Sequence, residues 1–293
     1  MNAQKNRPTG PQPPPAVQHL LVRYAKRGRM RFASHRDVGR AFERAVRQAG
    51  LPMAHSAGFS PHPKISYASG TPTGVSSEAE YLTLALTAAA DPARMRSVLD
   101  RALPDGIDVI EVVEDSGGSL NGRLMVSEWL VKLPGVAPDA AEAAAREFLA
   151  APEVMVERLT NKGLRRFDAR VAVLSLDVSP RGDVATEHDC AIIRMVVQHT
   201  EPAVRPEDVL TGFRLVTGLE PTSAPAVTRL AQGVLGPRDS GREVVPPTPA
   251  KVPGEVPVTV PDQVPVTVLA EGTVLAEGTV LAEGTVPAKV NVP

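Results

Sequence analysis

Residues 34–52 read Ser-His-Arg-Asp-Val-Gly-Arg-Ala-Phe-Glu-Arg-Ala-Val-Arg-Gln-Ala-Gly-Leu-Pro, and this stretch predicts a helix with clear ends. The apolar residues that recur at helical spacing are Val38, Ala41, Phe42, Ala45, Val46 and Ala49. Gly50 and Pro52 follow directly, and both residues are typical of a helix terminus. We therefore predict a helix over 35–49.

The start of this helix carries its own signature. Ser34 and Asp37 fit the S-x-x-D capping box, in which the serine side chain accepts from the third backbone N–H and the acid reaches back to the cap. This interpretation needs no ligand. His35 then lies in the first turn, beside unpaired N–H groups and the positive end of the helix dipole, where an anion is also favoured.

The segments around this helix follow the order of a ferredoxin-like unit. Residues 29–33 are predicted to be extended after a turn, and 55–63 form a stiff loop with two prolines. The predicted strands lie at 20–25, 65–68, 80–86 and 107–113, and the second helix at 91–103. The order β-α-β-β-α-β is that of a ferredoxin-like sandwich.

A second unit of related design follows the joint at 117–118. Its predicted strands lie at 126–133, 154–160, 167–178 and 191–197, and its predicted helices at 139–150, 206–212 and 224–233. The sequence therefore predicts an α+β fold with two ferredoxin-like α/β sandwich units in tandem, at 18–116 and 119–235.

The two ends differ from this body. Residues 1–17 are polar and rich in proline, and 236–293 are rich in proline and valine. The motif Val-Leu-Ala-Glu-Gly-Thr occurs three times over 268–285, and three copies bury too little to form a β-helix. We expect disordered N- and C-terminal tails. Neither a signal peptide nor a membrane span is visible, so we expect a cytoplasmic protein without a membrane partner.

Charge and cysteine content restrict the function classes. The net charge of the chain is -1, but 19–70 contain ten basic and two acidic residues. Cys190 is the single cysteine, which excludes an intrachain disulfide and a cluster held by several thiolates of this chain. A single cysteine fits a reducing compartment.

The basic residues of the predicted helix lie on one side of it. The four arginines at spacings of four, four and three are Arg36, Arg40, Arg44 and Arg47. Like charges so placed destabilise a helix slightly, and Glu43 can pair only with Arg47. The stripe indicates either a solvated face or a phosphate-facing surface. Further basic residues of the same segment are Lys26, Arg27, Arg29, Arg31 and Lys64.

The loop at 56–60 presents backbone N–H groups and one aromatic residue. Phe59 suits the stacking of a base, but the interpretation that it anchors the loop in the core is favoured. His62 lies between two prolines and is expected to be exposed. His35, His55 and His62 lack the spacing of a metal site, so we expect no metal and no cofactor.

The second unit contains one basic turn, at 161–170. It can extend the charged surface of the first unit. Asp168 alternates with Arg166 and Arg170, which predicts cross-strand charge pairing rather than catalysis.

Residues 31–37, 41–45, 56–66 and 72–80 together resemble a radical-SAM-associated protein family of unknown function. The resemblance covers roughly 20–235. In that family the domain is often fused behind, or encoded near, a radical SAM protein, so the resemblance implies a radical SAM partner rather than an activity. This chain is then a stand-alone form that lacks the radical SAM domain, and the radical chemistry belongs to another polypeptide.

Three functions follow from these observations. The first is an RNA-binding or RNA-presenting accessory protein, partnering a radical SAM enzyme in the modification of tRNA or rRNA. The second is a protein-interaction module that docks an acidic protein. The third is an enzyme that uses His35 and Asp37 as an acid–base pair, although the cap already engages Asp37. We assign no catalytic residue. The predicted nucleic-acid-binding residues are Arg29, Arg31, Ser34, His35, Arg36, Arg40, Arg44, Arg47, Phe59, His62 and Lys64.

Overall fold

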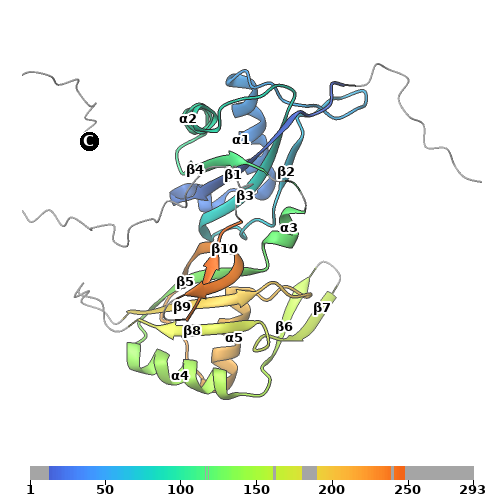
Figure 1. Ribbon diagram of the computed structural model, residues 1–293. Helices are drawn as coiled ribbons and strands as arrows, with labels where there is room; N and C mark the ends of the chain where they lie inside the picture. The colour runs from blue at the N-terminus through green and yellow to red at the C-terminus, as the bar shows by residue number, and fades with distance from the viewer. Residues whose placement is uncertain are drawn as a thin grey trace, which may run out of the picture. The chain divides into compact units, whose positions relative to one another are not determined.

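A computed structural model describes residues 13–115, 117, 119–160, 163–179, 190–238 and 241–247. Most of the predicted N-terminal tail and the three repeats at 268–285 lie outside these residues. The described chain is an α+β fold, as predicted (Figure 1). No helix among the described residues is both long enough and apolar enough to cross a membrane.

The first half of the fold is a ferredoxin-like unit. Its elements are β1 (Gln18–Lys26), the 3₁₀ helix η1 (Gly28–Phe32), α1 (His35–Gln48), β2 (Ile65–Tyr67), β3 (Ser76–Leu86), α2 (Pro92–Ala102) and β4 (Ile107–Glu114). The strand order is β4-β1-β3-β2, and every neighbour is antiparallel. Alternate residues of β1 and β3 face α1 and α2, so that Leu20, Leu82 and Phe42 share one core.

The second half repeats this topology with one insertion. Its elements are α3 (Leu120–Arg123), β5 (Val126–Pro134), α4 (Pro138–Ala150), β6 (Met155–Thr160), β7 (Gly163–Asp168), β8 (Val173–Val178), β9 (Cys190–Gln198), α5 (Pro206–Thr217), β10 (Ala226–Arg238) and β11 (Gly241–Val245). The strand order β10-β5-β9-β8 is again antiparallel, and β6 and β7 form a separate hairpin. Val131 and Ile193 pack with Phe148 and Phe213 in its core.

One edge of β3 joins the two halves into a continuous sheet. The C-terminal part of this strand pairs with β2, whereas Ser76 and Ser77 pair with Thr228 and Arg229 of β10 in parallel. The junction therefore places side chains of both halves within reach of one another.

Four local predictions were wrong. Residues 29–32 belong to η1 instead of an extended segment, because Gly28 reverses the chain at a φ of 51°. The predicted strand at 167–178 is interrupted between β7 and β8. Residues 224–233 form part of β10 instead of a helix, and the tail predicted from residue 236 includes the end of β10 and its partner β11. Two flanking strands, β3 and β5, determine the strand conformation of β10 and outweigh its ambiguous local pattern.

Candidate functional site

The predicted capping box forms at the start of α1. The backbone N–H of Asp37 donates to Ser34 Oγ at 3.2 Å, and Asp37 Oδ2 accepts from the backbone N–H of Ser34 at 3.2 Å. Hydrogen bonds from the side chain and backbone of Ser34, together with Arg40 and Arg36, lower the pKa of Asp37. The carboxylate is thus engaged in the cap rather than poised as an acid–base group.

The arginine stripe is exposed along α1. Arg47 pairs with Glu43 at 3.7 Å as predicted, and Arg40 lies 3.9 Å from Asp37. Among the described residues no carboxylate lies within ion-pair distance of Arg36 or Arg44. Within the described part of the chain, the stripe therefore presents two cations, Arg36 and Arg44, without an ion-pair partner.

A shallow depression connects α1 with β2, the edge strand. The residues that line its volume of about 530 Å³ are His35, Arg36, Gly39, Arg40, Glu43 and Tyr67. The ring of His35 meets the edge of Tyr67 at 5.3 Å between centroids and an angle of 81°. The first turn of α1 thus borders a surface with two rings and two arginines.

The loop before β2 holds its aromatic residue in solvent. Phe59 is 102% exposed, so the interpretation that it anchors the loop in the core was wrong. The loop closes on itself, because Ser56 and His62 exchange hydrogen bonds at 2.9 and 3.1 Å. His62 and Lys64 are exposed on the same loop.

Of the other basic residues in 19–70, some are exposed to solvent and others form hydrogen bonds or ion pairs within the fold. Arg29 and Arg31 are exposed on η1, and the guanidinium of Arg31 lies 4.6 Å from the ring of the half-exposed Phe32. Lys26 is buried and donates to the carbonyls of Thr71 and Pro72. Arg27 pairs with Glu78 and Asp108. Lys26 and Arg27 therefore stabilise the fold and do not extend the charged surface.

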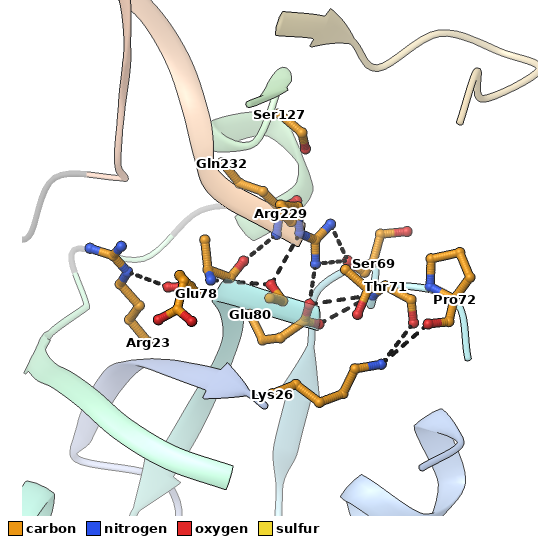
Figure 2. A network of polar contacts seen from close by, with 12 residues as sticks. Arg23, Lys26, Ser69, Thr71, Pro72, Glu78, Glu80, Ser127, Arg229 and Gln232 are labelled. Atoms are coloured by element: carbon orange, nitrogen blue, oxygen red, sulfur yellow. Dashed lines mark hydrogen bonds and ion pairs between the residues drawn. The ribbon is translucent and has the colours of Figure 1, made fainter. Parts of the chain in front are cut away.

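A buried ion pair at the junction was not foreseen. Arg229 of β10 lies 2.5 Å from Glu80 of β3, and each side chain is 4% exposed (Figure 2). Arg229 also donates to the carbonyl of Ser69 and to Ser77 Oγ. Burial opposes the ionisation of Glu80, but the attraction of Arg229, a hydrogen bond from Ser77 and the charge of Lys26 outweigh it and lower the pKa of Glu80.

Beside this ion pair lies a cavity of about 780 Å³, which we call the junction cavity. Its lining residues include Ser69, Pro72, Ser127, Trp129, Arg165, His199, Arg205, Arg229 and Gln232. Ser127 Oγ lies 2.7 Å from His199 Nε2. Burial lowers the pKa of His199 and outweighs a hydrogen bond of its ring to the backbone of Leu124. The hydroxyl of Ser127 and the ring of His199 thus share one hydrogen bond in the lining of the cavity.

Backbone contacts hold both His55 and Asp168. His55 forms a backbone bridge with Pro63, and the part of the chain that the structure describes gathers no three His, Cys, Asp or Glu side chains suited to a metal. Asp168 accepts from the backbone N–H groups of Val154 and Arg170, both at 2.9 Å. Its cross-strand neighbour in the β6–β7 hairpin is the uncharged Met155, so the predicted charge pairing across the strands was wrong at Asp168. Residues 161–162 of the basic turn lie outside the described chain.

The fold and the two sites define a tandem ferredoxin-like protein with a basic helix and a junction cavity. The chain belongs to the bacterial family described as "Uncharacterized protein conserved in bacteria (DUF2344)", whose model matches residues 19–206. One similar solved structure is titled "Crystal Structure of a Cbf5-Nop10-Gar1 Complex"; it is 13% identical, with a TM-score of 0.39 over 79% of this chain. The match covers 55% of that chain, and at this score it supports no conclusion about function. No curated protein matches the sequence.

Proposed function

We propose that the protein is a cytoplasmic RNA-binding accessory protein that holds an unpaired strand along its first half. The proposed binding surface is called the α1 surface, and its residues are Arg29, Arg31, Ser34, His35, Arg36, Arg40, Arg44, Arg47, Phe59, His62 and Lys64. The observation that carries the proposal is the exposed arginine stripe, in which Arg36 and Arg44 have no carboxylate within ion-pair distance among the described residues.

Phosphates account for such a stripe better than solvent does. Like charges one turn apart disfavour a helix by a few tenths of a kcal/mol, and a polyanion converts this cost into attraction. With a rise of about 1.5 Å per residue, Arg36 and Arg47 are separated by roughly 16 Å along the helix axis, which is long enough for several nucleotides.

Exposed aromatic rings favour a single strand over a duplex. Phe59 is at the loop before β2, and Phe32 follows Arg31 on η1. Bases of an unpaired strand stack on such rings, whereas paired bases are already stacked in their helix. The rings and the arginines therefore suit one extended ligand.

The resemblance to radical-SAM-associated proteins extends this proposal to a partner. A chain with one cysteine cannot supply the three thiolates that hold the cluster of such an enzyme. We propose that the protein presents tRNA or rRNA to a radical SAM enzyme and performs no radical chemistry itself. Recovery of both the enzyme and RNA with the tagged chain tests this extension.

The binding proposal is tested by fluorescence anisotropy with a labelled single-stranded RNA over a range of salt concentrations. The double variant Arg36→Ala/Arg44→Ala should bind more weakly and lower the salt slope by about 1.4, since each phosphate contact contributes about 0.7 on a single strand. Phe59→Ala should weaken binding by about 1–3 kcal/mol without changing this slope.

The matched control removes two arginines from another helix. Arg94 and Arg101 are exposed on α2, so Arg94→Ala/Arg101→Ala changes the net charge equally and should leave binding nearly unchanged. Equal loss in both double variants, or binding independent of salt, contradicts the proposal. A protein partner that survives nuclease treatment and is lost only in the α1 variant supports the acidic-partner alternative instead.

A further inference from the structure

The junction cavity has the size and position of a ligand site. Its volume of about 780 Å³ falls within the range of small-molecule pockets, roughly 300–1,000 Å³. It lies where β5 and β10 of the second half meet the segment 69–72 of the first half. Both halves therefore contribute to its wall.

An unpaired acceptor lies at the buried end of this cavity. Gln232 is 0% exposed, and its Nε2 donates to the carbonyl of Ala79 at 2.6 Å. Because a carbonyl accepts and does not donate, this bond fixes the orientation of the amide. Gln232 Oε1 then has no hydrogen-bond partner among the described residues. A ligand with an N–H or O–H group would satisfy it.

A second acceptor lies nearby. Ser127 is 1% exposed, and its hydroxyl shares one hydrogen bond with the ring of His199. A hydroxyl oxygen has two lone pairs, so at least one of them is left for a ligand donor. The charge of Arg229 is compensated by Glu80, so the inner wall does not attract an anion. The inner wall selects a neutral group that carries hydrogen-bond donors.

The outer part of the cavity, in contrast, carries positive charge. Arg165 and Arg205 line it and are exposed, and Arg205 lies directly before α5. Trp129, Leu124 and Val197 add apolar side chains to the lining of the same cavity. A ligand that matches this arrangement has a flat, partly apolar body with N–H donors and a negatively charged group at its other end.

We propose that the junction cavity binds one nucleotide, with the base at Gln232 and Ser127 and the phosphate at Arg165 and Arg205. The nucleotide is either free or an unpaired residue of RNA held by the α1 surface, and only the second source rests on the proposed function. The segment 72–74 links the two sites, because Pro72 lines the cavity and the backbone N–H of Gly74 donates to the carbonyl of Arg31 in the α1 surface.

Trp129 allows a direct test, since it is the only tryptophan of the chain and lines the cavity. Its fluorescence is titrated with AMP, GMP, CMP and UMP on the full chain. At least one of them should change the emission saturably. Ser127→Ala and Gln232→Met should each weaken this binding by about tenfold or more, the loss of one hydrogen bond to a buried polar group.

Neighbouring arginines of β7 provide the matched control. Arg165 lines the cavity, whereas Arg166 points to the other face of the strand and does not line it. Arg165→Ala should weaken binding of the monophosphate but not of the corresponding nucleoside, and Arg166→Ala should change neither. Circular dichroism confirms that each variant is folded.

The outcomes separate the two proposals. The nucleotide site is overturned if none of the four monophosphates changes the emission saturably, or if the Ser127, Gln232 and Arg165 variants bind as the wild type does. Either result counts against the cavity even if RNA still binds the α1 surface. Nucleotide binding that persists in Arg36→Ala/Arg44→Ala supports the cavity even if RNA binding fails. Competition by single-stranded RNA assigns the nucleotide to RNA, and its absence assigns it to a free nucleotide.

Discussion

The guanidinium of Arg229 in β10 pairs with the carboxylate of Glu80 in β3 at 2.5 Å, across 149 positions of the chain. Ser77 and Thr71 contribute further hydrogen bonds to the same pair. Each half of the protein supplies one of the two charges. Both charges are buried, so each half depends on the other for compensation.

Removal of one side chain of this ion pair should therefore lower the stability of the protein. Arg229→Met leaves a buried carboxylate without its main counter-ion and should lower the free energy of unfolding by about 3–5 kcal/mol in urea denaturation. The double variant Arg229→Met/Glu80→Met should recover much of this loss. The exposed pair of Arg214 and Glu220, at 3.5 Å, is the control, and Arg214→Ala should cost less than about 1 kcal/mol. Equal costs for Arg229→Met and Arg214→Ala would contradict a role for burial.

Two helical glycines should respond to alanine in opposite directions. A Cβ at Gly212 in α5 would lie 2.7 Å from the ring of Phe148 and 2.9 Å from Val154, so Gly212→Ala should destabilise by about 1–3 kcal/mol. At Gly39 in α1 the nearest atom is Tyr67 Oη at 3.8 Å, and Gly39→Ala should stabilise by about 0.5–1 kcal/mol. Thermal unfolding measures both, and shifts of the same sign would refute this packing.

Replacement by alanine should affect stability differently at the two serine N-caps, Ser34 and Ser119. Ser34 accepts from Asp37 in the capping box, and Ser34→Ala should lower the free energy of unfolding by about 1 kcal/mol. Ser119 precedes α3 without a side-chain cap hydrogen bond, so Ser119→Ala should stay within about 0.5 kcal/mol of wild type. The comparison fails if Ser119→Ala proves the more damaging change.

The titration of His199 should make stability depend on pH. Burial lowers the pKa of His199 in the folded state below its usual 6.5, so protons bind the unfolded state first. The contribution of His199 to stability is complete above the pKa of this residue in the unfolded state. It is lost as the pH falls through the pKa of His199 in the folded state. Urea denaturation between pH 5 and 8 should show this slope, and His199→Gln should reduce it. An unchanged slope in the variant would place the titrating group elsewhere.

Local sequence patterns predicted those helices and strands whose caps and apolar spacing lie within a few residues of one another. The apolar spacing and Ser34–Asp37 located α1 to within one residue, and alternation located β1, β4 and β5 closely. The same patterns misassigned residues 224–233, because a central strand between β3 and β5 receives its conformation from distant partners. Arginines of α1 were found because they repeat along one helix.

The junction cavity had no such signal. Ser127 and His199 are 72 positions apart, and Gln232 meets Ala79 across 153 positions. Periodicity does not report contacts of this length. Phe59 shows the converse error, because one aromatic residue in a loop has the same local sequence whether it is buried or exposed.

The parallel contact between β3 and β10 also has a consequence for synthesis. Ser77 leaves the ribosome 152 residues before Arg229, and during this interval the edge of β3 has no strand to cover it at that position. An uncovered edge is a site of mispairing between nascent chains. The last central strand to be translated is thus the one that closes the sheet, and the first half reaches its native environment only when the second half is nearly complete.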